Sequence, residues 1–148
     1  MGLFRLLDVF RDKHPEPLPA PDAKLALGAL LVRVAKSDKD YSAQEIGLID
    51  RILAQHFGLK PIEAAKMRAT CEKLHAAAPD SDRFAKLIRD GLPRSDRMEA
   101  LTDLWMVVLA DGRQDAAEVA IVDTARIAMG LAEEDSSQAR AEAMRNLA

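Results

Sequence analysis

The sequence has little cysteine and few aromatic residues, and both shortages restrict the fold. One cysteine, Cys71, occurs in 148 residues, so no disulfide can form within the chain and we expect a reducing, cytoplasmic compartment. Aromatic residues make up 4% of the chain, whereas alanine occurs 26 times. Strands favour aromatic and β-branched side chains and alanine favours helices, so the composition predicts an all-α fold.

Long apolar runs and an excess of one charge are also missing. No segment approaches the ~18–20 apolar residues of a membrane span, and the N-terminus lacks the pattern of a signal peptide. The 21 basic and 24 acidic residues give a net charge of −3. Nucleic-acid-binding domains usually carry a clustered basic face, so we expect no nucleic-acid partner.

Motifs typical of catalysis are absent from the sequence as well. It contains no Gly-x-Ser-x-Gly, no phosphate-binding glycine loop and no His-Glu-x-x-His. His14, His56 and His75 are dispersed and lack the spacing of metal ligands. We therefore expect a protein that is not an enzyme, with a small metal-dependent enzyme as the alternative.

Apolar periodicity predicts a compact bundle of about seven helices over residues 22–148. The first begins after Asp22, and Leu27, Leu30, Leu31 and Val34 form its buried face. A short helix near the middle of the chain is expected to be capped by Asp80 or Ser81.

Residues 1–21 form a separate segment. Residues 2–12 predict an amphipathic helix, and four prolines follow within residues 15–21, which favours an extended spacer. We expect this helix to dock on protein, either on the bundle or on a second copy in a homodimer. The alternative is weak binding to a membrane surface, since the basic side chains are few.

Two polar turns repeat without a gap at an offset of 73 residues. Asp38, Ser42, Glu45 and Ile46 align with Asp111, Asp115, Glu118 and Val119. Such a repeat implies an internal duplication of a helical hairpin, related by a pseudo-two-fold axis. Whether the two turns meet in one cleft is not fixed by the pattern.

The acidic residues of these turns have two explanations. Ser42 with Glu45, and Asp115 with Glu118, have the spacing of capping boxes. Asp38 and Asp111 follow helix C-termini, where the helix dipole disfavours a carboxylate. Either the Asp side chain accepts backbone N–H bonds within the turn, or a cation offsets the charge. The sequence leaves both open.

These residues resemble those of the TerB-like family, named after a tellurite-resistance protein. The resemblance lies in Glu99–Glu118, with a looser copy in Leu31–Asp38, and it covers roughly residues 22–135. It implies a bundle of about seven helices without known catalysis, acting in stress response or as an interaction module. The family also includes the N-terminal domain of a membrane-anchored DnaJ-type co-chaperone, so we expect a protein partner, with a membrane-associated one as a candidate.

The resemblance also implies a metal ion held by clustered acidic residues, and Ca²⁺ and Mg²⁺ are the candidates because they prefer oxygen ligands. Carried over by position, these are Asp38, Glu45, Asp111, Asp115 and Glu118. Ser42 and Lys39 stand where the second turn has Asp115 and Gly112, so the second turn fits the metal site better.

Overall fold

The computed structural model describes residues 19–79, 82–112 and 114–148, and this part of the chain is helical. The predicted helix at residues 2–12 lies outside the described residues, as do the start of the spacer and the expected caps Asp80 and Ser81. The helices are α2 (Ala23–Lys36), α3 (Ala43–Phe57), α4 (Pro61–Ala77), α5 (Arg83–Gly91), α6 (Arg94–Leu109), α7 (Ala116–Ala128) and α8 (Glu133–Leu147). The all-α prediction is therefore confirmed.

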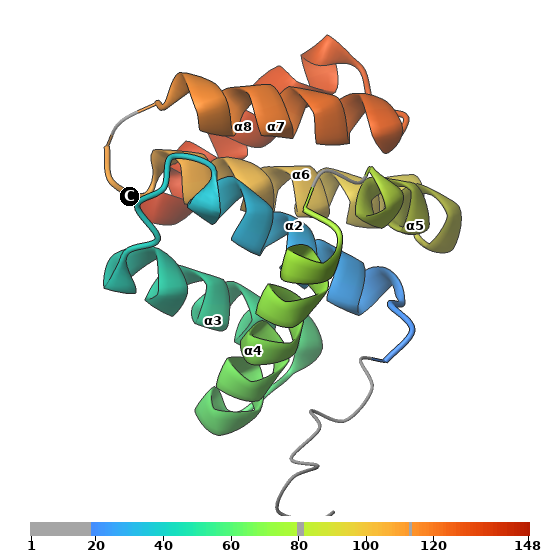
Figure 1. The fold of residues 1–148 in the computed structure, drawn as a ribbon. Helices are drawn as coiled ribbons and strands as arrows, with labels where there is room; N and C mark the ends of the chain where they lie inside the picture. The colour runs from blue at the N-terminus through green and yellow to red at the C-terminus, as the bar shows by residue number, and fades with distance from the viewer. Residues whose placement is uncertain (1–18, 80–81, 113) are drawn as a thin grey trace, which may run out of the picture.

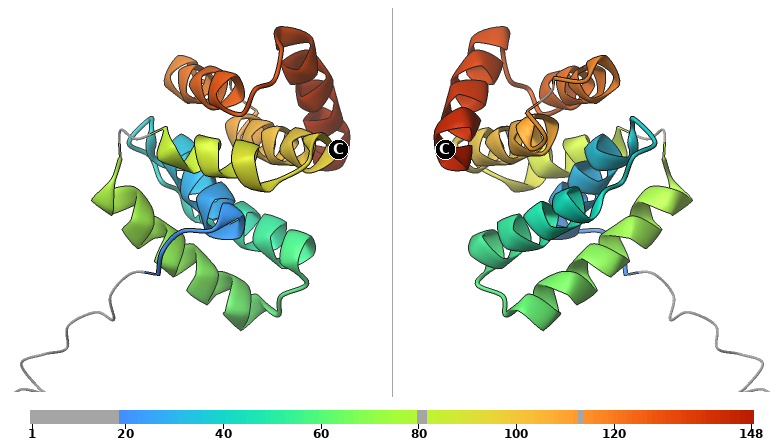
Figure 2. Two further views of the ribbon diagram at one scale, coloured as in Figure 1. Left: turned by 90° about the vertical axis from the view of Figure 1, so that its right-hand side faces the viewer. Right: turned by 90° about the vertical axis from the view of Figure 1, so that its left-hand side faces the viewer.

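The helix α2 lies in the middle of the molecule (Figure 1). It packs against α3, α4, α5, α6 and α7, and most of its residues from Ala26 to Ala35 are buried. A helix that is apolar on nearly every side is stable in water only when neighbours surround it. The other helices thus form a shell around α2, with α7 and α8 on one side and α3 and α4 on the other (Figure 2).

Helix ends follow the predicted local rules in most places. The Asp22 carboxylate accepts a hydrogen bond from the N–H of Leu25, and Gly58 ends α3 in a left-handed conformation. The cap of α5 was predicted wrongly. Its N-cap is Asp82, one residue after Ser81, and the Asp82 side chain makes no capping bond.

The repeat persists in three dimensions but its halves differ. The ends of α2 and α6 and the starts of α3 and α7 are each 73 residues apart. The α2–α7 and α3–α6 contacts are the reciprocal pair that a pseudo-two-fold axis produces. However, α4 packs against both α2 and α3, whereas α8 packs mainly on α6. The three helices of the first half therefore all pack on one another, whereas α8 in the second half packs mainly on one helix.

Candidate functional site

The two acidic turns lie together at one end of the molecule (Figure 1). Gln44, at the start of α3, donates a hydrogen bond from Nε2 to the carbonyl oxygen of Ala110 at the end of α6, at 3.0 Å. The sequence could not decide whether the turns meet. The structure joins them, so their acidic residues form one candidate site.

The backbones of both turns use the same left-handed conformation. Lys39 has φ 65° and Gly112 has φ 78°, and these positions are equivalent in the repeat. Glycine adopts this conformation without strain, whereas a residue with a Cβ does so at a cost. The backbone of the first turn is therefore strained at Lys39, whereas the second turn avoids this strain with Gly112.

In the first turn, hydrogen bonds within the turn hold most of the acidic groups. The Asp38 carboxylate accepts the N–H of Asp40 at 2.9 Å, as predicted for a structural turn. Glu45 Oε1 accepts the N–H of Ser42 at 3.3 Å, while Ser42 Oγ accepts the N–H of Glu45 at 3.2 Å. This capping box is confirmed.

In the second turn, only half of the predicted capping box forms. The Asp115 carboxylate accepts the N–H groups of Ala117 and Glu118. The return bond from the Glu118 side chain to the N-cap backbone is not among the contacts of the described residues. Glu118 is nevertheless only 4% exposed, so capping does not explain why this carboxyl group is buried.

We call the group of Asp38, Glu45, Asp111, Asp115 and Glu118 the acidic junction. Burial, the main cause, and the charges of the other four members together raise the pKa of Glu118 from 4.5 to about 8. Electrostatic coupling of this kind requires the five groups to lie near one another. The residues predicted from the sequence are therefore brought together by the fold.

Glu45, like Glu118, is a buried carboxyl group with a raised pKa. It is 7% exposed, and burial raises its pKa, with further contributions from Asp38 and Asp111. Its Oε2 is buried and has no hydrogen-bond partner among the described residues. A buried carboxylate oxygen left unpaired is unfavourable unless a proton or a cation neutralises it.

The negative charge of these groups suits a bound cation, but their arrangement in the structure does not form a metal site. Carboxylate oxygens are the ligands that Ca²⁺ and Mg²⁺ prefer. Yet in the described part of the chain no three acidic, histidine or cysteine side chains are arranged closely enough to hold a metal ion. Coordination by the acidic junction would therefore require a rearrangement of its side chains, two of which, Glu45 and Glu118, are buried.

A second feature was not predicted from the sequence. A groove of about 1230 Å³ runs between α3, α6 and α8, and we call it the α3/α6/α8 groove. Its lining includes Leu48, Ile52, His56, Met98, Met106 and Leu147. Apolar periodicity cannot reveal a groove that three separate helices form.

An ion pair lies at the floor of this groove. His56 Nε2 approaches Oδ2 of Asp103 to 2.6 Å, and Asp103 is nearly buried. The Asp103 carboxylate is the main cause that raises the pKa of His56, while burial raises the pKa of Asp103 itself. The sequence analysis noted only that His56 lacks the spacing of a metal ligand, and it had no means to find a partner 47 residues away.

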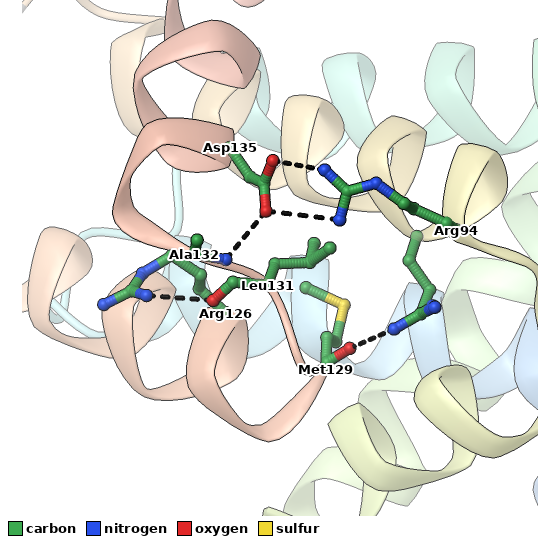
Figure 3. A network of polar contacts seen from close by, with 7 residues as sticks. Arg94, Arg126, Met129, Leu131, Ala132 and Asp135 are labelled. Carbon is green, nitrogen blue, oxygen red and sulfur yellow. Dashed lines mark hydrogen bonds and ion pairs between the residues drawn. The ribbon is translucent and has the colours of Figure 1, made fainter.

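The connection from α7 to α8 is fixed by arginines (Figure 3). Arg94 pairs with Asp135, whose Oδ2 also accepts the N–H of Ala132 at 2.7 Å. Arg126 donates to the carbonyl oxygen of Leu131 at 3.0 Å. Arg94 is the main cause that lowers the pKa of Asp135. Arg94, Asp135 and Ala132 thus hold the start of α8, while Nε of Arg126 is buried without a hydrogen-bond partner among the described residues.

Fold and site define the class: a duplicated, all-helical module whose two equivalent acidic turns meet at one junction. The family model described as tellurite resistance protein TerB matches residues 24–141, and the chain belongs to this family. No curated protein and no solved structure matches the chain. Among the described residues, no helix has the length and hydropathy that a membrane crossing needs.

Proposed function

We propose that this chain is a non-catalytic TerB-like module of stress response, related to tellurite resistance, whose acidic junction binds a divalent cation. Ca²⁺ and Mg²⁺ are the ions we propose, because every candidate ligand is an oxygen. In this proposal the acidic junction with its bound cation contacts a protein partner. Membrane-associated proteins are among the candidate partners. The cytoplasmic location stays a prediction.

The observation that carries the proposal is the state of Glu45 and Glu118. Both are buried beside three other acidic residues, and both have a raised pKa. A structural role as caps explains Asp38, Ser42 and Asp115 through hydrogen bonds that are present. It does not account for the unpaired Oε2 of Glu45 or the buried carboxyl group of Glu118. A cation would favour the charged form of both.

The second turn should contribute more to binding than the first. Asp115 adds a carboxylate at the position that Ser42 occupies in the first turn, and Gly112 leaves the turn free of a side chain where Lys39 stands. Lys39 in the first turn and Arg113 in the second each bring one positive charge, so the basic residues do not distinguish the two turns.

The test is a thermal melt of the whole chain titrated with Ca²⁺ or Mg²⁺, on the alkaline side of the Glu118 pKa so that the carboxylate is charged. A ligand that binds only the folded state raises the melting temperature, with about 2.7 kcal/mol of stabilisation at 100 times its Kd. We expect the shift in the wild type and a much smaller one in Asp111→Asn.

The matched control is Asp90→Asn, which removes the same charge from an exposed position at the end of α5. It should keep the full shift. If no divalent ion at millimolar concentration shifts the wild-type melt, or if both variants lose the shift equally, the cation proposal is wrong and the acidic junction has only a structural role.

A further inference from the structure

We infer that copies of this chain associate head to tail, with the outer side of α4 in one copy packed antiparallel on the outer side of α7 in the next. The α4 face is made by Ile62, Lys66, Ala69 and Lys73. The α7 face is made by Ala116, Ala120, Asp123 and Ile127. Neither face contains a member of the acidic junction, so the inference does not rest on cation binding.

The α7 face is uncovered although its counterpart in the first half is covered by a helix. Asp50 and Ala54 of α3 are the counterparts of Asp123 and Ile127 at the offset of 73 residues. Asp50 pairs with Arg68 of α4 at 2.6 Å, and Ala54 is half-buried. In the second half α8 packs mainly on α6, which leaves the Asp123 side chain 54% exposed and Ile127 65% exposed. The repeat therefore indicates that this side of α7 suits a packed helix.

The α4 face has the same need of a partner. Ile62 is 72% exposed, and it and Ile127 are the two most exposed large apolar side chains in the described part of the chain. Lys66 and Lys73 are exposed beside it, and the buried residues of α4 lie on the opposite side of that helix. Moving both isoleucines out of water together is favourable.

The spacing along the two faces matches. From Ile62 onward, successive members of the α4 face are four, three and four residues apart. From Ile127 backward, the members of the α7 face follow at the same intervals. Antiparallel packing therefore places Ile62 against Ile127. One turn further along, Lys66 meets Asp123.

The charges of the two faces are opposite in sign. The α4 face carries two lysines, whereas Asp123 and Asp115, the residue just before the α7 face, are acidic. Between the charges Ala69 lies opposite Ala120, and such small side chains let two helices approach closely. Packing α4 on α4, or α7 on α7, would bring like charges together, so electrostatics favours the mixed pair.

The positions of α4 and α7 in the molecule determine what kind of assembly results. They lie on opposite sides of it (Figure 2), so one copy can use both faces at once with two different neighbours. An interface between two different surfaces builds rows or rings of copies instead of a closed pair. Two helix faces make a small interface, so the association is weak and grows with protein concentration.

The test is sedimentation of the whole chain at concentrations up to about 1 mM, with EDTA present so that no divalent cation contributes. We expect the average mass of the wild type to rise above that of the monomer. Ile62→Asp and Ile127→Asp should each remain monomeric alone. Their equimolar mixture should form a pair and nothing larger, because each variant supplies the face that the other lacks.

A wild type that stays monomeric throughout, a mixture that stays monomeric, or a loss of association in one of the two variants only would overturn the inference. The last result would mean that one face pairs with itself. Met144→Asp is the matched control: Met144 is 51% exposed on α8, outside both faces, so this variant should associate like the wild type.

A charge exchange tests the pairing itself. Lys66→Asp and Asp123→Lys should each abolish the rise in mass, because each brings like charges together. The two changes in one chain should restore it, since the charges are then exchanged between the faces. A combined variant that stays monomeric while its thermal melt matches that of the wild type would overturn the proposed alignment.

Discussion

At the scale of single residues, the left-handed positions of the two turns are the clearest difference between the halves. Lys39 adopts the conformation that Gly112 adopts in the other turn. Space around Gly112 is open, since an added Cβ would contact nothing within 4 Å. Any effect of substitution at this position therefore reports backbone strain and not a clash.

We expect Lys39→Gly to raise the free energy of unfolding by about 0.5–1 kcal/mol, and Gly112→Ala to lower it by about 1 kcal/mol. Urea denaturation of both variants measures this. Gly47→Ala is the control: Gly47 lies within α3 with open space around it, so alanine should stabilise the helix there. A stabilising Gly112→Ala would contradict the strain.

The raised pKa of Glu118 has a consequence for stability. Its folded-state value of about 8 lies above the ordinary 4.5, so the folded state holds the proton more tightly than the unfolded state does. The contribution of this group is therefore fully present below about pH 4.5 and is lost as the pH rises through about 8.

We expect Glu118→Gln to remove this dependence. Without added divalent ions, the variant should be more stable than the wild type at pH 9, and the difference should shrink as the pH falls toward 5. Urea denaturation across this range measures it. Glu134→Gln, on the exposed face of α8, should keep the wild-type profile. If the free energy of unfolding of Glu118→Gln changes with pH in parallel with that of the wild type, Glu118 is charged in the folded state throughout this pH range.

At the scale of helices, α2 and α4 approach each other closely at Gly28. A Cβ added at Gly28 would lie 2.2 Å from Sγ of Cys71, which is itself completely buried. Glycine at this position lets the two helices approach, and the cysteine fills the space that results. Apolar periodicity predicted both helices but could not reveal this pair, because it depends on how the helices cross.

We expect Gly28→Ala to lower the free energy of unfolding by about 1–3 kcal/mol through overpacking. Cys71→Ala should have a smaller effect alone and should partly rescue Gly28→Ala, because it makes room for the new methyl group. A double-mutant cycle by urea denaturation measures this coupling. Strictly additive effects would mean that α2 and α4 shift apart instead.

At the scale of the whole molecule, the sequence predicted what depends on neighbours along the chain. The helices, the Ser42–Glu45 capping box and the equivalence of the two turns all follow from spacing within a few residues or from the repeat. The His56–Asp103 ion pair and the burial of Glu118 did not follow, because both result from helices packing across the molecule. The repeat was the one long-range signal, and it identified the acidic residues of both turns without showing that the turns meet.

The closure of α4 against both α2 and α3 also bears on how the chain acquires its structure during synthesis. Residues 23–77 contain the whole of α2, α3 and α4, which pack on one another, but the faces of α2 that α5, α6 and α7 cover stay exposed until those helices have been synthesised. The later helices α6 and α7 need α2 as a surface on which to assemble. The N-terminal half thus provides the surface on which the C-terminal half assembles. A destabilising substitution in α2 would delay the folding of both halves.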